Sequence, residues 1–307
     1  MKWIKILLLQ VASVIPQTPS AQEVSKLMSH ESSFSMFREP SYITFTGGAG
    51  NIEKLIFEAD IMPYYLLKLS NSDRWGIELS PEVIMRMYNE ESLPVRTPSF
   101  MPRITGFYQF RESNNGKPDL FGYISLWHHS NGQENNFYNE DSITINTRSG
   151  NFSTNSIEGG FFMSEPDKRH PFVTRYIKFS SLYHFAQAEE LKSIYGDLRF
   201  FIDLQGVINI TKTLRALNIL PNNTRPNYAI LYLSTKFGYI ADDYNHYKAL
   251  SLKRLIFKGT LSYKPSFLRD VTLFTQYYYG QDYYNIYFAR QLHVLRIGLM
   301  AKPFFIN

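Results

Sequence analysis

Two side chains separated by one residue, His128 and Ser130, have the types needed to cleave an ester. A serine hydroxyl is a weak nucleophile at neutral pH, and a neutral imidazole within hydrogen-bond reach removes its proton as the hydroxyl attacks. On a β-strand, residues i and i+2 point to the same face, so a strand would place the two groups next to each other. The pair is therefore suited to acyl transfer if a strand carries it.

The segment around this pair has the pattern of such a strand. His128 and Ser130 share their parity with Ile124 and Leu126, which indicates that the pair lies on an apolar face. If that face met lipid, an unpaired polar group there would cost several kcal/mol, so we expect the pair to have a function and its substrate to be the surrounding lipid. A His-x-Ser pair also occurs by chance in many proteins, and by itself it does not decide between these interpretations.

Alternation with a period of two recurs along the chain and predicts long strands. The clearest example is 198–211, where apolar residues fill one parity and mainly polar residues the other; 227–237 and 293–301 repeat the pattern. Such strands are longer than the usual five or six residues of a globular protein. We predict an all-β fold, an antiparallel transmembrane β-barrel of about 12 strands. The chain ends with Phe304 and Phe305 close to its last residue, which only partly matches the terminal aromatic residue common in such barrels.

Composition supports a membrane barrel over a soluble globule. The chain has 22 Tyr and 24 Phe, and membrane barrels use aromatic girdles at both interfaces. No internal stretch approaches the roughly 18 uninterrupted apolar residues of a spanning helix. There is no cysteine, which excludes disulfides and thiolate zinc sites. No basic run is interleaved with aromatic residues, so we expect no nucleic-acid partner.

The N-terminus predicts export from the cytoplasm. Residues 1–22 show the basic start, apolar run and small-residue end of a secretory signal peptide. Residues 23–50 are predicted to be a polar leader. Residues 51–307 are predicted to form the single barrel domain.

Several motifs carry a resemblance to a known family. The run His128-His-Ser-Asn-Gly132 resembles the His-x-Ser-Asn-Gly signature of the outer-membrane phospholipase A family, and segments 89–96, 273–280 and 287–299 are similar to further parts of that family in the same order. The resemblance covers roughly residues 80–300. It implies a calcium-dependent phospholipase A1/A2 of the bacterial outer membrane that hydrolyses glycerophospholipids and lysophospholipids and is active as a homodimer.

The resemblance also implies a third catalytic residue, an asparagine that orients the histidine. The family's Ser-Arg-Ser-Trp-Asn-Arg stretch is missing here, and Phe137-Tyr-Asn139 is its nearest counterpart. Asn139 shares its parity with Ile143 and Ile145 on a predicted following strand. Asn136 would then point inward and Asn146 would lie too far along, so Asn139 is the predicted residue.

The remaining implied residues would stabilise negative charge. The family uses a glycine N–H and a calcium ion at the developing oxyanion, and the matching glycine is Gly132. The implied calcium ligands are the carbonyl of Gln133, the side chain of Asn135 where the family has serine, and Ser92 of a second subunit. Taken alone, Ser92 is also compatible with an ordinary polar loop residue.

Two other classes of function compete with the enzyme. A passive barrel would keep the scaffold as a pore or as a structural or adhesion protein without activity. A soluble periplasmic or secreted β-sandwich that binds a ligand would also be rich in tyrosine. Cell fractionation separates the soluble protein from the two barrels, and an assay of lipid hydrolysis separates the enzyme from the passive barrel.

Overall fold

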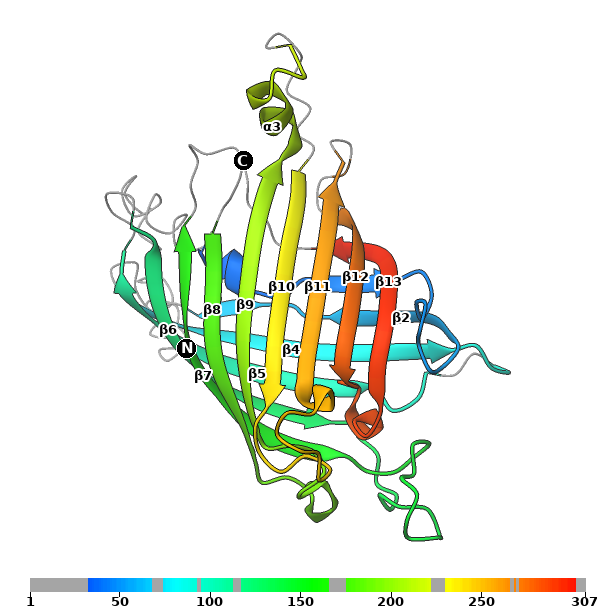
Figure 1. Ribbon diagram of the computed structural model, residues 1–307. Helices are drawn as coiled ribbons and strands as arrows, with labels where there is room; N and C mark the ends of the chain where they lie inside the picture. Colours follow the sequence, from blue (N-terminus) through cyan, green and yellow to red (C-terminus); the bar gives the residue numbers. More distant parts are fainter. Residues whose placement is uncertain are drawn as a thin grey trace, which may run out of the picture.

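The computed structural model describes residues 33–67, 74–92, 95–112, 117–165, 175–221, 230–265, 268 and 271–301. The predicted signal peptide and the terminal Phe304 and Phe305 lie outside these residues. Across the described ranges, no helix is both long enough and apolar enough to cross a membrane. Strands dominate the structure (Figure 1).

The strands form one closed antiparallel barrel. Every strand from β4 to β12 pairs with the next one in sequence, β13 pairs with β1, β1 with β2, and β2 with β4. This circuit contains twelve strands, and the short β3 pairs only with β4 beside the end of β2. The prediction of an all-β antiparallel barrel of about 12 strands is confirmed.

The bounds of the strands are as follows: β1 Ser41–Thr44, β2 Leu55–Ile61, β3 Tyr65–Leu67, β4 Trp75–Tyr88, β5 Ser99–Arg111, β6 Asp119–Ser130, β7 Ser153–Glu165, β8 Arg175–Phe185, β9 Leu198–Asn209, β10 Ile230–Ile240, β11 Leu255–Lys264, β12 Val271–Gln281 and β13 Gln291–Ala301. Short helices lie in the connections: η1 Glu189–Leu191, α3 Ile210–Ala216, η2 Leu252–Arg254 and η3 Asn285–Tyr287.

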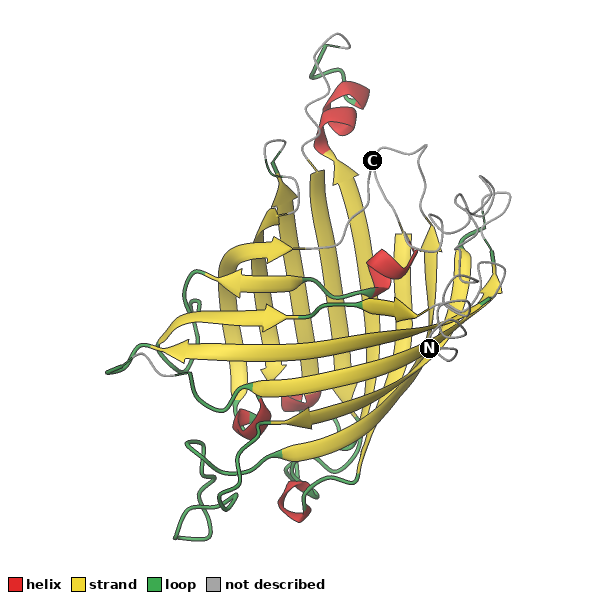
Figure 2. Ribbon diagram, turned by 180° about the vertical axis from the view of Figure 1, so that it is seen from behind, coloured by secondary structure: helices red, strands yellow, loops and turns green. Residues whose placement is uncertain are grey.

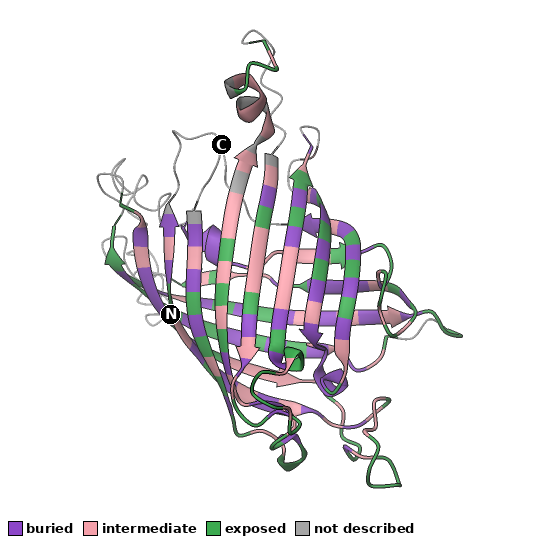
Figure 3. Ribbon diagram, viewed as in Figure 1, coloured by how far each residue is buried: buried purple, intermediate pink, exposed green. Residues whose placement is uncertain are grey.

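Burial alternates along the strands, as the period of two predicts (Figure 3). On β9, Phe200, Ile202 and Leu204 are exposed on the outer surface. The opposite parity faces the lumen, where Arg199 is buried. The strand predicted over 198–211 is shorter than expected, because the chain turns into α3 at Ile210.

The N-terminal segment begins the barrel earlier than predicted. Residues 33–37 form a helical turn inside the ring of strands (Figure 2). Phe34 and Phe37 pack there against inward rings such as Phe107, with centroids 4.8 and 4.9 Å apart. Glu39 forms ion pairs with Lys236 of β10 and Lys258 of β11, two neighbouring strands, and β1 starts at Ser41. The leader predicted over 23–50 therefore ends within the barrel, and its boundary at residue 51 lies in the β1–β2 loop.

One end of the barrel carries ordered loops packed on a shared apolar cluster. Aromatic and aliphatic side chains from the β6–β7, β8–β9 and β12–β13 loops meet there above β4 and β5. Phe137, Phe152, Leu191, Ile286 and Phe288 are each at most 2% exposed. This cluster holds in place the loop that follows Ser130.

Candidate active site

Ser130 is the last residue of β6, at the end of the barrel with the ordered loops. The register places it between Phe100 of β5 and Ser153 of β7. On the same parity, Ile124 and Leu126 are 60% and 49% exposed, so this is the outer face of the barrel. The strand thus presents His128 and Ser130 on its apolar outer face, as its parity predicts.

The residue between them points the other way. His129 faces the lumen and its ring packs against Phe152, with centroids 4.8 Å apart. Trp127 has the same inward parity, and the Arg103 guanidinium lies 4.2 Å from the centroid of its ring. His128 and Ser130 are therefore separated from the polar lumen by the sheet itself.

The imidazole of His128 has an asparagine partner on the neighbouring strand. His128 is paired in register with Asn155 of β7, and its Nδ1 lies 2.9 Å from the Asn155 Oδ1. The Asn155 Nδ2 donates to the carbonyl of Ala186 at 3.3 Å, which orients the amide so that its oxygen faces the ring. Because that oxygen only accepts, Nδ1 carries the proton and Nε2 is left as the basic nitrogen.

The hydroxyl and the imidazole are neighbours but are not yet bonded. The structure has no hydrogen bond between Ser130 and His128, although both side chains lie on one face two positions apart. Hydrogen bonds between catalytic groups are often long in a free enzyme and tighten when substrate binds. The arrangement brings a hydroxyl, an imidazole and an amide together from two adjacent strands, which are the groups that ester hydrolysis by a serine needs.

Asn131 fixes the turn that follows the serine. It is 1% exposed, and its Oδ1 accepts hydrogen bonds from the backbone N–H groups of Gln133 and Phe152 at 3.2 and 3.0 Å. Its Nδ2 donates to the carbonyl of Gly150 at 2.8 Å. One side chain thus joins both ends of the β6–β7 loop directly beside Ser130.

Gly132 adopts a conformation that favours glycine. Its φ is +65°, in the left-handed region that other L-residues occupy only with strain. In the described part of the chain, its N–H has no hydrogen-bond acceptor. An exposed N–H two residues after the nucleophile is available to a substrate oxygen.

The structure does not place the predicted Asn139 beside His128. Asn139 lies in an exposed turn of the β6–β7 loop, where its Nδ2 donates to Thr144 Oγ1 at 2.9 Å. The strand predicted to follow it is absent, since β7 starts only at Ser153 and Ile143 lies in the loop. The position opposite His128 is therefore filled by Asn155, a residue that parity along one strand could not identify.

The residues predicted to bind calcium lie at the same end of the barrel as Ser130. Gln133 and Asn135 follow Ser130 on the loop, and Asn135 has an exposed side chain while its carbonyl accepts from the Asn151 N–H at 2.8 Å. Ser92 is exposed in the β4–β5 turn at the same end. Among the described residues no group of three His, Cys, Asp or Glu side chains could hold a metal.

The predicted ligands of one chain are too few to fill the coordination shell of a calcium ion. Oxygen is the donor that calcium prefers, but the ion takes about six to eight of them. The Gln133 carbonyl and the Asn135 side chain of one chain leave most positions to water or to a second chain. Oxygen ligands are compatible with calcium, and water or a second chain would have to supply the remaining oxygen ligands.

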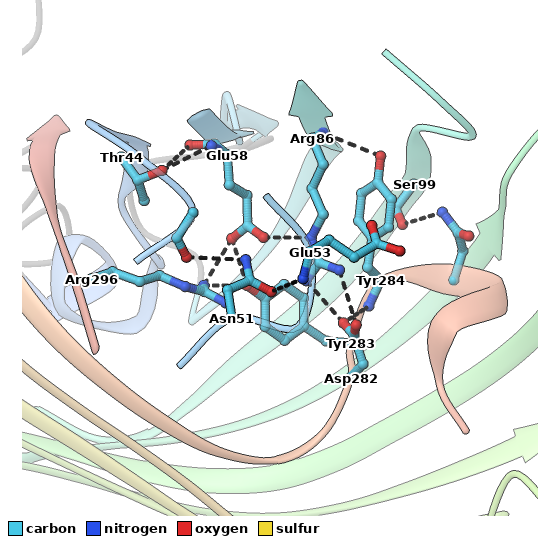
Figure 4. Close-up of polar contacts among 12 residues, drawn as sticks. Thr44, Asn51, Glu53, Glu58, Arg86, Ser99, Asp282, Tyr283, Tyr284 and Arg296 are labelled. Carbon is cyan, nitrogen blue, oxygen red and sulfur yellow. Dashed lines mark hydrogen bonds and ion pairs between the residues drawn. The ribbon is translucent and has the colours of Figure 1, made fainter. Parts of the chain in front are cut away.

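A buried ion-pair network supports this end of the barrel from inside, and no sequence pattern indicated it. Arg86 of β4 contacts Glu58 of β2 at 2.7 Å and binds both carboxylate oxygens of Asp282 at 2.9 Å (Figure 4). Arg296 of β13 contacts the same Glu58 at 2.8 Å. The network joins three strands to the start of the β12–β13 loop, which packs under the site.

Comparison with known proteins supports the fold. No protein-family model and no curated protein sequence matches the chain. The solved structure of outer membrane phospholipase A from Escherichia coli is 14% identical over 87% of this chain and 98% of its own, with a TM-score of 0.56.

Two related structures give similar values. The Salmonella typhi outer membrane phospholipase dimer with bound calcium is 14% identical over 86% of this chain and 90% of its own, with a TM-score of 0.55. An active-site mutant of the Escherichia coli protein, with an asparagine changed to alanine, is 13% identical over the same shares, with a TM-score of 0.54. The chain therefore has the fold of outer membrane phospholipase A.

Proposed function

We propose that this protein is an outer-membrane phospholipase that hydrolyses acyl ester bonds of glycerophospholipids and lysophospholipids. The observation that carries the proposal is the hydrogen bond between His128 and Asn155 on the same outer face as Ser130. The fold shared with outer membrane phospholipase A supports it independently of these residues.

The two strands supply the groups for acyl transfer. His128 Nε2 takes the proton of the Ser130 hydroxyl as its oxygen attacks the ester carbonyl carbon. The protonated ring then gives this proton to the departing glycerol oxygen, leaving the acyl group on Ser130. Water, activated by the same nitrogen, releases the fatty acid and restores the serine.

Asn155 holds the imidazole in the required tautomer throughout these steps. Its Oδ1 accepts from Nδ1 and partly compensates the positive charge that the ring acquires. A neutral amide suits a site on a lipid-facing strand, because it orients the ring without placing a full negative charge in an apolar environment.

The oxyanion of the tetrahedral intermediate needs hydrogen-bond donors. The exposed N–H of Gly132 is the donor that the loop geometry offers. Calcium bound by the Gln133 carbonyl and the Asn135 side chain would supply positive charge near this oxyanion. Ser92 of a second copy would add another ligand, with water in the remaining positions, and the active form would then be a homodimer.

The outer surface supports a location in a membrane. Large apolar side chains on nearly every long strand point outward, whereas most buried charged groups face the lumen. In a bacterial outer membrane this surface would meet hydrocarbon, and the ester groups of lipids would approach Ser130 near one interface.

The test is hydrolysis by purified protein in detergent micelles with calcium. We expect release of fatty acid from phosphatidylethanolamine, and we expect Ser130→Ala to abolish it while the barrel stays folded. The matched control is Ser153→Ala, which changes the cross-strand neighbour of Ser130 and should retain activity. Equal release by Ser130→Ala would refute the assignment, and no release by the folded wild type would favour a passive barrel.

A further inference from the structure

The β10–β11 loop, residues 241–254, folds against the outer wall of the barrel at the end with the ordered loops (Figure 1). The hydroxyls of two tyrosines, Tyr239 of β10 and Tyr279 of β12, donate to the carbonyls of Ala249 and Leu252 at 2.8 and 3.0 Å. Both tyrosines have the outward parity of their strands. The second half of the loop therefore lies on the outside of the barrel and not over its lumen.

A buried arginine fixes the shape of this loop. Arg254 is 7% exposed, and its guanidinium donates at 2.5 to 3.1 Å to four backbone carbonyls, those of Ile240, Asp242, Tyr247 and Lys248. These hydrogen bonds join the start of the loop to its end. The exposure of the side chains between them is therefore a property of a folded loop.

Two leucines of this loop point away from the protein. Leu250 is 98% exposed and Leu252 is 69% exposed. They continue the apolar outer surface of the barrel, because Leu255 at the start of β11 is also exposed and is paired with the outward-facing Tyr239. In water such side chains make few contacts, whereas at the boundary of a bilayer they are buried among lipids.

Two lysines flank these leucines. Lys248 and Lys253 are both exposed, and the Lys253 Nζ lies 4.6 Å from the centroid of the Tyr247 ring. A lysine can lay its carbon stem along an apolar surface and keep its ammonium group among the lipid headgroups, where it attracts anionic lipids. The acidic residues of the loop, Asp242 and Asp243, come at its start, so the half with the leucines carries positive charge.

We propose that residues 248–253 form an anchor at the membrane interface. The anchor inserts Leu250 and Leu252 among the acyl chains and places Lys248 and Lys253 at the phosphates of anionic phospholipids. The inference rests on the membrane location in the proposed function, but not on hydrolysis. The occupant is lipid, because the leucines continue the surface that would meet the bilayer and the lysines carry the charge opposite to that of the phosphates. The anchor fixes the height of this end of the barrel relative to the headgroups.

The first test measures the depth of the loop in a bilayer. The chain has no cysteine, so one introduced thiol carries a fluorescent label at a chosen position. Leu250→Cys, in a Ser130→Ala background that prevents hydrolysis, is labelled with NBD and placed in nanodiscs of phosphatidylcholine and phosphatidylglycerol. We expect phospholipids spin-labelled near the headgroup to quench this label several-fold more strongly than a label in Ile143→Cys. Ile143 is the matched control, because it is 79% exposed on the β6–β7 loop, which projects beyond the strand ends (Figure 1).

A label in Tyr277→Cys, on the outer face of β12, reports whether the barrel itself lies in the bilayer. Quenching at position 277 without stronger quenching at 250 than at 143 would overturn the anchor and leave the membrane location standing. No quenching at 277 would refute the membrane location, and the anchor with it. Hydrolysis by the wild type is measured separately, since neither result depends on it.

The second test concerns the two lysines. Native mass spectrometry gives the ratio of phosphatidylglycerol to phosphatidylcholine that the protein retains from an equal mixture. We expect Lys248→Gln and Lys253→Gln each to lower this ratio by about 5-fold. The matched control is Lys192→Gln at the same end of the barrel, whose side chain is 58% exposed and paired with Glu189, and which should leave the ratio unchanged. A ratio that neither loop variant changes would overturn the assignment of lipid phosphates to this loop.

Discussion

At the scale of single residues, the orientation of one imidazole decides what this site can do. Asn155 fixes the proton on His128 Nδ1, because its own Nδ2 is held by the Ala186 carbonyl. Without this contact the ring can rotate or adopt the tautomer that cannot accept the serine proton. In the proposed mechanism, the asparagine is therefore a positioning residue for the base.

We expect Asn155→Ala to reduce kcat for ester hydrolysis by roughly 10- to 150-fold, since a hydrogen bond to the charged ring contributes about 1.5–3 kcal/mol. The measurement is the rate of fatty-acid release at saturating substrate with calcium. Asn155→Asp should retain more activity than the alanine variant, because a carboxylate also accepts from Nδ1.

Asn139→Ala is the matched control for this prediction. Its side chain contacts only Thr144 in an exposed turn, so we expect a change of less than about 2-fold. If Asn139→Ala loses more activity than Asn155→Ala, the orienting residue is Asn139 after all, and the loop rearranges in the active form.

At the scale of elements, the β6–β7 loop that follows Ser130 packs against the β12–β13 loop. The hydrogen bonds of Asn131 join the two ends of the β6–β7 loop. In the apolar cluster this loop packs against Ile286 and Phe288 of the β12–β13 loop, the second loop. The second loop is in turn fixed by Asp282, whose carboxylate binds Arg86 inside the barrel. The ion-pair network therefore helps to hold the β6–β7 loop in place, because it fixes the β12–β13 loop against which that loop packs.

We expect Arg86→Ala to lower the free energy of unfolding by about 3–5 kcal/mol, because Glu58 and Asp282 would stay buried with less compensation. Urea unfolding in detergent micelles measures this change. The control is Arg290→Ala, whose partner Glu53 and whose own side chain are 22% and 30% exposed, and for which we expect about 1 kcal/mol or less. If both variants lost the same free energy of unfolding, the buried network would contribute no more to stability than an exposed ion pair.

At the scale of the whole molecule, the barrel has an apolar outside and a charged, filled inside. The N-terminal segment and its ion pairs, such as Glu39 with Lys236 and Lys258, occupy the lumen. The remaining space includes chambers of about 210 and 70 Å³. Because the lumen is filled, the barrel is better suited to be a rigid scaffold than a wide pore. The proposed reaction takes place on its outer face.

A shared calcium site makes a prediction about two copies of the chain. Ser130→Ala and Ser92→Ala are each expected to be impaired, because one lacks the nucleophile and the other a ligand for its partner. Mixed dimers contain one complete site, so refolding the two variants together in equal amounts should restore about one quarter of wild-type activity if pairing is random.

The measurement is calcium-dependent lipid hydrolysis after co-refolding, with each variant alone as the control and with chelation expected to abolish the regained activity. Activity that stays at the mean of the two separate variants would show that each site draws all its ligands from one chain.

The sequence by itself determined the barrel and the common outer face of His128 and Ser130. Both depend on the relation between i and i+2 along a single strand, which places alternate residues on one face whatever the rest of the chain does. The outward parity of His128 and Ser130 follows from Ile124 and Leu126 in the same way, and so does the apolar face of β9.

Only the tertiary structure decided which asparagine meets the histidine. The partner of His128 depends on the register between β6 and β7, and these strands are separated by a loop from residue 131 to 152 whose path is fixed by packing against other loops. The same reason applies to the N-terminal segment inside the lumen, which packs against strands that no local pattern connects to it.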